Sequence, residues 1–125
     1  MANDARRVGS QFETDLVSYA RGRGLLVERL ARAGANDEGD LVLDGGSYII
    51  EAKARRDAKS SLNLHAWLTE AHTEAQNYAR ARNRGSSPVP VLIVKNPRHS
   101  IGKAFVVMYL SDFIQGGEDA VPEDV

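Results

Sequence analysis

Residues 40–53 read DLVLDGGSYIIEAK, two short apolar runs joined by a glycine pair, and this stretch decides the fold. Apolar runs that flank a Gly-Gly turn are typical of a β-hairpin. A turn centred on the glycine pair places Asp40 opposite Glu51, whereas a turn one residue earlier places Glu38 opposite Glu51. In both registers two carboxylates meet at the open end of the hairpin, where apolar side chains would pack more easily.

The charges at this end of the hairpin allow two interpretations. Opposed side chains in a hairpin have β-carbons roughly 4.5–5.5 Å apart, and like charges at that distance are destabilising. Lys53 shares the face of Glu51, because side chains alternate along a strand. One interpretation is a solvated ladder of charges in which Lys53 neutralises one acid. The other is a Mg²⁺ site built from carboxylate oxygens, with a lysine placed to orient or deprotonate the water that attacks a phosphodiester.

The remaining sequence predicts helices before and after the hairpin. Apolar residues recur at helical spacing near the N-terminus and again in the middle of the chain, and short apolar runs indicate further strands. The expected elements are a helix at 5–22, a strand at 25–31, the hairpin, a helix at 63–83, strands at 89–94 and 104–109, and a short helix from Ser111. This α-β-β-β-α-β-β-α order predicts an α/β fold, a mixed sheet of about five strands flanked by helices. We expect one domain over 1–111, followed at 112–125 by a short helix and an acidic tail.

The composition narrows the class of protein. The 125 residues are 42% hydrophobic and 26% charged, as in an ordinary globular domain. There is no cysteine, which excludes disulfides and thiolate zinc sites. No apolar run approaches the roughly 18 residues of a membrane span, and the start MANDARRVGS lacks the apolar stretch of a secretion signal. We therefore expect no membrane association and a cytoplasmic protein, in a prokaryotic cell or a phage-infected host.

The charge distribution is uneven along the chain. Sixteen basic and seventeen acidic residues give a net charge of −1, and five of the acids lie in 112–125, which has no base. Residues 1–111 therefore carry 16 bases and 12 acids, a net charge of +4. A mildly basic body with an acidic tail is compatible with nucleic-acid binding.

The first expected helix adds a second motif to the hairpin. Gly9, Phe12 and Glu13 form a Gly-x-x-Phe-Glu pattern in which the phenylalanine lies in the apolar stripe and the glutamate at its edge. Together with Asp40 and the Glu-x-Lys that ends at Lys53, this pattern resembles the PD-(D/E)xK nuclease superfamily. The version that begins with a glutamate helix is similar to the Holliday-junction resolvases of archaea and their phage relatives.

This resemblance covers about residues 8–110 and implies a restriction-endonuclease-like sheet and a divalent metal, Mg²⁺ with Mn²⁺ as a substitute. It implies 5′-phosphate and 3′-hydroxyl products, a homodimer, and a role in DNA recombination and repair. Two positions depart from the family pattern: Gly39 stands where the superfamily often has proline, and Ala35 falls near a serine of the archaeal proteins. The site residues that the resemblance implies are the metal ligands Asp40, Glu51 and Glu13, the backbone carbonyl of Ala52, and the catalytic Lys53.

Several polar and basic residues are candidates for DNA contacts. A glutamine on the long helix approaches the active site in related nucleases, and basic residues after a strand are well placed to contact phosphates. A solvated surface is the alternative interpretation for each of them. The expected DNA-binding residues are Arg29, Arg32, Asn36, Arg55, Arg56, Lys59, Gln76, Arg80 and Lys95.

From these observations we expect a Mg²⁺-dependent, structure-selective DNA endonuclease that acts on four-way junctions as a homodimer. Two alternatives remain open from the sequence. One is a DNA-binding module that keeps the nuclease fold without cutting, and the other is a nuclease of the same superfamily that acts on flaps or single strands.

Overall fold

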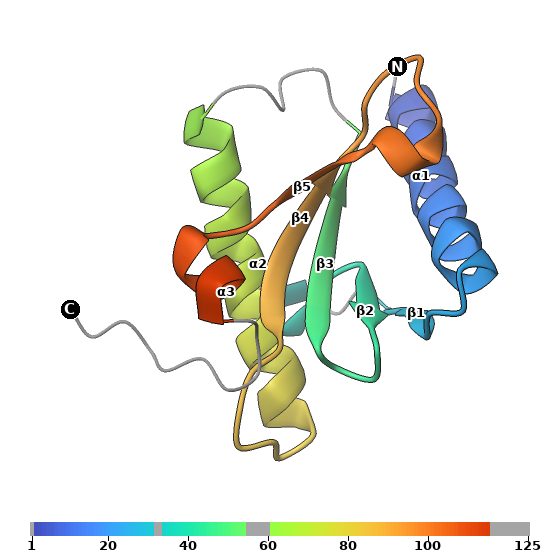
Figure 1. Cartoon of the computed structure of the whole chain (residues 1–125). Helices are drawn as coiled ribbons and strands as arrows, with labels where there is room; N and C mark the ends of the chain where they lie inside the picture. The colour runs from blue at the N-terminus through green and yellow to red at the C-terminus, as the bar shows by residue number, and fades with distance from the viewer. Residues whose placement is uncertain (1, 32–33, 55–60, 116–125) are drawn as a thin grey trace.

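The chain forms one mixed sheet with helices on both sides, in a computed structural model that describes residues 2–31, 34–54 and 61–115 (Figure 1). The predicted element order is confirmed. The elements are α1 (Ala2–Gly22), β1 (Val27–Arg29), β2 (Leu41–Leu43), β3 (Tyr48–Lys53), α2 (Ser61–Ala81), β4 (Val89–Val94), β5 (Phe105–Val107) and α3 (Leu110–Gln115), with 3₁₀ turns at Gly34–Asn36 and Ile101–Lys103.

Element boundaries differ from the expected ones by a few residues. The first strand spans three residues rather than seven, because only Val27 in it is buried and Leu25 and Leu26 face solvent. The last helix begins at Leu110, so it spans the expected boundary between 111 and 112. The acidic tail beyond residue 115 lies outside the described residues, so its predicted separation from the domain stays a prediction.

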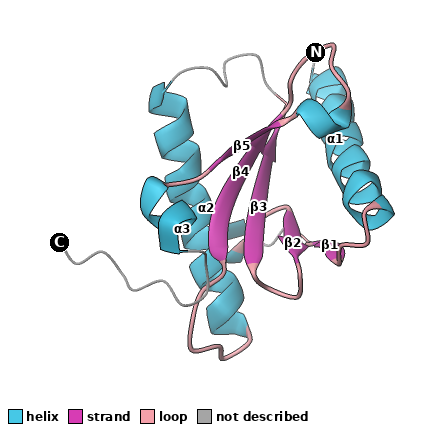
Figure 2. Ribbon diagram, in the orientation of Figure 1, coloured by secondary structure: helices cyan, strands magenta, loops and turns pink. Residues whose placement is uncertain are grey.

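The five strands lie in their sequence order, β1-β2-β3-β4-β5 (Figure 2). Three neighbouring pairs are antiparallel, while β3 and β4 run parallel. A parallel pair needs a crossover connection, and α2 supplies it. The result is the predicted mixed α/β sheet, with β3 and β4 next to each other inside it.

Helices α1 and α2 pack on opposite faces of the sheet, as the alternating side chains of β3 show. Ile50 packs with Phe12 and Leu16 of α1, whereas Ile49 packs with Ala75 and Tyr78 of α2. Because side chains alternate along a strand, Glu51 and Lys53 project from the same face as Ile49. The regular geometry of a pleated strand therefore directs both charged groups toward α2.

The hairpin turn settles which residues are opposed. Asp44, Gly45 and Gly46 have φ values of 55°, 66° and 113°, the left-handed conformation that glycine adopts without a steric penalty. The turn pairs Leu41 with Ile50, and the two residues next along the ladder are Asp40 and Glu51. The first of the two predicted registers is therefore confirmed.

Helix α2 also holds the loop that leads into Asp40. The Asn77 side-chain amide donates a 2.8 Å hydrogen bond to the carbonyl of Asp37, and Arg82 forms a 2.9 Å ion pair with Glu38. Gly39 follows with a φ of 101° and is buried. The contacts at Asp37 and Glu38 therefore hold the segment that leads into β2 against α2.

Within residues 2–31, 34–54 and 61–115, no helix has the length and apolar character that crossing a membrane requires.

Candidate active site

The open end of the hairpin places Asp40 and Glu51 close together. The Asp40 Oδ2 atom accepts a 2.9 Å hydrogen bond from the backbone N–H of Ala52, which ties the carboxylate across the two strands. The Asp40 backbone N–H donates to the carbonyl of Ile50 at 3.0 Å. The aspartate is therefore oriented toward β3 by both its main chain and its side chain.

Lys53 lies among acidic and aromatic side chains. Its Nζ atom is 3.1 Å from Glu51 Oε2 and 3.7 Å from Glu70 Oε1, and it lies 5.2 Å from the centre of the Trp67 ring. Only 18% of the lysine side chain is exposed. The Lys53 ammonium is thus held beside the cluster of carboxylates by the negative charges of Glu51 on β3 and Glu70 on α2.

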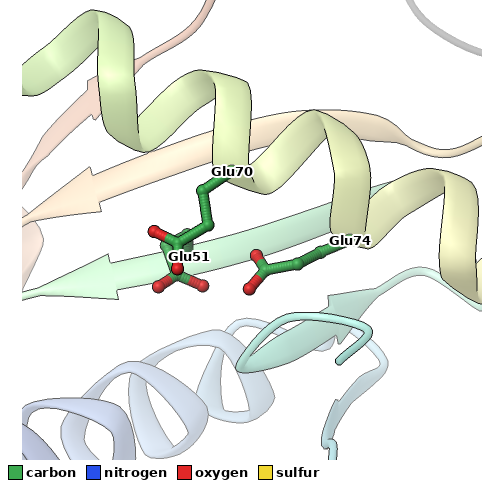
Figure 3. Close-up of side chains that lie close together, drawn as sticks. All are labelled: Glu51, Glu70 and Glu74. Atoms are coloured by element: carbon green, nitrogen blue, oxygen red, sulfur yellow. The ribbon is translucent and has the colours of Figure 1, made fainter. Parts of the chain in front are cut away.

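Helix α2 brings two further carboxylates to the site. Glu70 and Glu74 are one helical turn apart, and their side chains converge on Glu51 between the helix and the strand (Figure 3). One carboxylate oxygen from each of the three residues lies within 4.8 Å of the others. Glu51 and Glu74 are buried, while Glu70 is at the solvent edge.

This crowding changes the acidity of the buried carboxyl groups. Burial raises the pKa of Glu51, and the nearby Asp40 charge raises it further, against the lowering effect of Glu74 and Lys53. Burial also raises the pKa of Glu74 to about 9, and the hydrogen bond with Glu51 and the charges of Glu51, Glu70 and Asp40 act in the same direction. In the metal-free protein these raised pKa values favour a proton held between Glu74 and Glu51 at neutral pH.

This protonation predicts how stability varies with pH. The folded state holds a proton on Glu74 up to about pH 9, while the unfolded chain releases it near the ordinary value of 4.5, so stability should fall as pH rises between these values. In EDTA, Glu74→Gln should remove much of that loss and raise the stability at pH 8 by at least about 1 kcal/mol, or roughly 3–6 °C in Tm. Thermal melts at pH 5.5 and 8 measure both effects. The exposed Glu28→Gln is the control, and a Glu74→Gln variant with wild-type pH dependence would contradict the assignment.

The same residues fit a divalent cation. Glu51 Oε1 and Glu74 Oε1 are buried atoms with no hydrogen-bond partner among the described residues. The donor atoms are all carboxylate oxygens, which suits Mg²⁺, Ca²⁺ or Mn²⁺ rather than a metal that prefers nitrogen or sulfur. A cation would pair with the oxygens that no protein donor reaches.

Two further predicted site residues come from the two long helices. Glu13 is on α1, across the sheet from α2, and its Oε1 atom accepts a 3.1 Å hydrogen bond from Arg29. Gln76 is exposed and lies about 200° around α2 from Glu74, given roughly 100° per helical residue. The structure therefore brings Asp40, Glu51 and Lys53 together, whereas Glu13 is bound by Arg29 on the α1 side of the sheet and Gln76 lies on the exposed side of α2.

The predicted DNA contacts divide into described and undescribed residues. Arg29 bonds to Glu13 and Thr14, Arg80 bonds to Asn77, Asn36 is exposed, and Lys95 is half-buried directly after β4. Arg32, Arg55, Arg56 and Lys59 lie outside the described residues.

Sequence reasoning missed Glu70 and Glu74. The signal for the second was present, because Glu74 is three residues after Ala71 and four before Tyr78, both members of the apolar stripe of α2. An acid at such a position has to be buried with a partner or exposed by a shift of the helix. Glu70 lies beside the stripe and carries no comparable signal.

Comparison with solved structures finds a protein of similar shape. The chain is similar to Archaeoglobus fulgidus Hjc, a Holliday junction resolvase from an archaeal hyperthermophile. The match has 18% sequence identity and a TM-score of 0.45, and it covers 86% of this chain and 91% of that one. No family model and no curated protein matches the chain.

Proposed function

We propose that this protein is a Mg²⁺-dependent DNA endonuclease that cleaves branched DNA as a Holliday-junction resolvase does. The observation that carries the proposal is the convergence of Asp40, Glu51 and Lys53 on one face of the hairpin end. Two carboxylates beside a lysine form an arrangement suited to hydrolysis of a phosphodiester.

Asp40, Glu51 and the carbonyl of Ala52 would hold the cation. Glu13, which Arg29 binds on the α1 side of the sheet, is proposed as a further ligand, direct or through water. When bound, the cation supplies Lewis-acid stabilisation of the charge that develops on the attacked phosphate. The N–H of Ala52 keeps the Asp40 carboxylate in place at 2.9 Å, so this ligand needs no reorganisation.

Lys53 contributes a second positive group to the site. Its ammonium is oriented by Glu51 and Glu70 and lies near the ring of Trp67, which limits its contact with solvent. A charge held in a partly dry site interacts more strongly with phosphate than one in water. In this proposal Lys53 would orient a water for attack or donate to a phosphate oxygen.

Substrate selectivity is tested most directly with matched DNA molecules. The purified protein should cut a four-way junction in Mg²⁺ and in Mn²⁺, and should lose this activity in EDTA. A flap, a plain duplex and a single strand of the same sequence are the comparisons. Preference for the flap or single strand would identify a different nuclease activity, and junction binding without cleavage in either metal would identify a DNA-binding module.

We further predict a homodimer. Resolution of a four-way junction requires nicks in two opposed strands, and two active sites related by a two-fold axis can make them. The edge strand β5 and helix α3 expose a group of large apolar side chains beside a cavity of about 380 Å³. Such an exposed patch is typical of an interaction surface. Met108 is partly buried against the core, and the exposed apolar residues are Phe105, Val106, Leu110, Phe113 and Ile114.

Light scattering at micromolar concentration should report about twice 13.6 kDa. Val106→Asp should shift the protein toward monomer, because it places a charge in the exposed patch. Leu26→Asp is the matched control, since both side chains are 63% exposed and Leu26 precedes β1 at the other edge of the sheet. A strictly monomeric wild type that still resolves junctions would contradict the dimer.

A further inference from the structure

Helix α2 presents two acids to the hairpin that the proposed catalytic set does not use. Glu70 and Glu74 project from successive turns toward Glu51, and Figure 3 shows the three carboxylates gathered between α2 and β3. Because the three residues come from two separate elements, their convergence is set by the packing of the helix on the sheet.

The burial of this group is the second observation. Glu51 and Glu74 are each 7% exposed, and the Oε1 atom of each is buried with no hydrogen-bond partner among the described residues. A buried acceptor that is left unpaired is unfavourable, and more so when it is charged. The ion pairs of Lys53 reach the Oε2 atom of Glu51 and the Oε1 atom of Glu70, so they do not satisfy these two oxygens.

We propose that Glu51, Glu70 and Glu74 form a second divalent-cation site, adjacent to the position formed by Asp40, Glu51 and the carbonyl of Ala52. Glu51 is shared between the two positions. The proposal rests on the proposed function only for that neighbouring position, while Glu70 and Glu74 belong to the second site alone.

The size and chemistry of the site select the class of cation. Three carboxylate oxygens within 4.8 Å of one another can surround one ion, since Ca²⁺–oxygen distances of about 2.3–2.6 Å permit ligand separations up to roughly 5 Å. Mg²⁺, with distances near about 2.1 Å, requires the oxygens to move somewhat closer. Glu70 can supply that movement, because 51% of its side chain is exposed.

The exposure of Glu70 also gives the ion a path from solvent. A cation that enters there meets Lys53, whose ammonium is 3.7 Å from Glu70 and competes for its carboxylate. Removal of that ammonium by Lys53→Met should therefore strengthen binding of the cation to the α2 site by about tenfold or more, because a repelling charge beside the site is gone.

Direct binding of Mn²⁺ to the full-length protein without DNA tests the proposal. Calorimetry should detect two Mn²⁺ ions on the wild type. Glu74→Gln and Glu70→Gln should each raise the Kd of one ion by about tenfold or more, while Asp40→Asn should weaken the other ion and leave the α2 site loaded. Glu28→Gln, which changes an exposed acid on β1, should bind both ions as the wild type does.

Tb³⁺ luminescence provides a local readout, because Trp67 is the single tryptophan of the chain and its ring lies beside Lys53. Excitation of the tryptophan should sensitise bound Tb³⁺ in the wild type and in Asp40→Asn, and the signal should fall in Glu70→Gln. Glu70→Gln alters a half-exposed side chain, so its fold is expected to be intact. A melting temperature in EDTA equal to that of the wild type checks this.

The outcomes separate this site from the proposed nuclease activity. One ion that persists in Asp40→Asn and is lost in Glu74→Gln supports the α2 site even if no DNA is cut. Cleavage by the wild type with Mn²⁺ binding unchanged in both Glu70→Gln and Glu74→Gln overturns the α2 site and leaves the nuclease proposal standing.

Discussion

Replacing Asp40 by Asn should lower the rate of junction cleavage by about 10³-fold or more while DNA binding persists. The substitution removes one negative charge from the proposed Mg²⁺ position and weakens the hold on the metal. The asparagine side-chain oxygen can still accept the Ala52 N–H, so the hairpin should remain intact. DNA affinity should stay constant or increase, because a carboxylate that repels phosphate is gone.

Matched variants separate the roles within the site. Glu51→Gln should act like Asp40→Asn, because both carboxylates belong to the same metal position. Lys53→Ala should also stop cleavage, but without weakening the binding of metal. Asp44→Asn is the control for Asp40→Asn: it makes the same change on the exposed turn of the same hairpin, where the φ of 55° suits asparagine. Single-turnover rates and DNA titrations measure the two quantities, and wild-type cutting by Asp40→Asn would refute the mechanism.

Gly39→Pro should destabilise the protein by about 3 kcal/mol or more. Proline requires a φ near about −65°, whereas Gly39 has a φ of 101°. An added β-carbon would also lie 2.7 Å from the Cγ2 atom of Ile49, a buried core residue. A proline at position 39 is therefore incompatible with this backbone.

Gly39→Ala meets the same close contact and should cost less than proline, roughly 1–3 kcal/mol. Gly9→Ala is the control, because that glycine lies inside α1 with open space around it and should gain about 0.5–1 kcal/mol. Urea unfolding measures each difference. Because Gly39 immediately precedes Asp40, loss of the native loop should also reduce cleavage, and a Gly39→Pro variant as stable as the wild type would contradict the strained conformation.

Local patterns were sufficient for the fold. The Gly-Gly turn between two apolar runs restricted the hairpin to two registers, since a one-residue slip would move Ile49 and Ile50 to the wrong faces. The element order was indicated by the helical spacing in α1 and α2 and by the apolar run of β4. Each of these patterns depends only on neighbours a few residues away in the sequence. The same alternation is enough to place Glu51 and Lys53 on one face of β3.

Tertiary packing alone decided which acidic residues of the site are buried. Whether Glu74 is a solvated helix acid or a buried one depends on how α2 rests on β3, which brings together Glu51 and Glu74, 23 positions apart in the sequence. The pairing of Glu13 with Arg29 likewise depends on the approach of α1 to β1. The sequence by itself determined which strand carries the carboxylates and the lysine, because strand geometry is periodic. Only the packed structure decided which helix acids join them, because burial and charge coupling arise from contacts between distant parts of the chain.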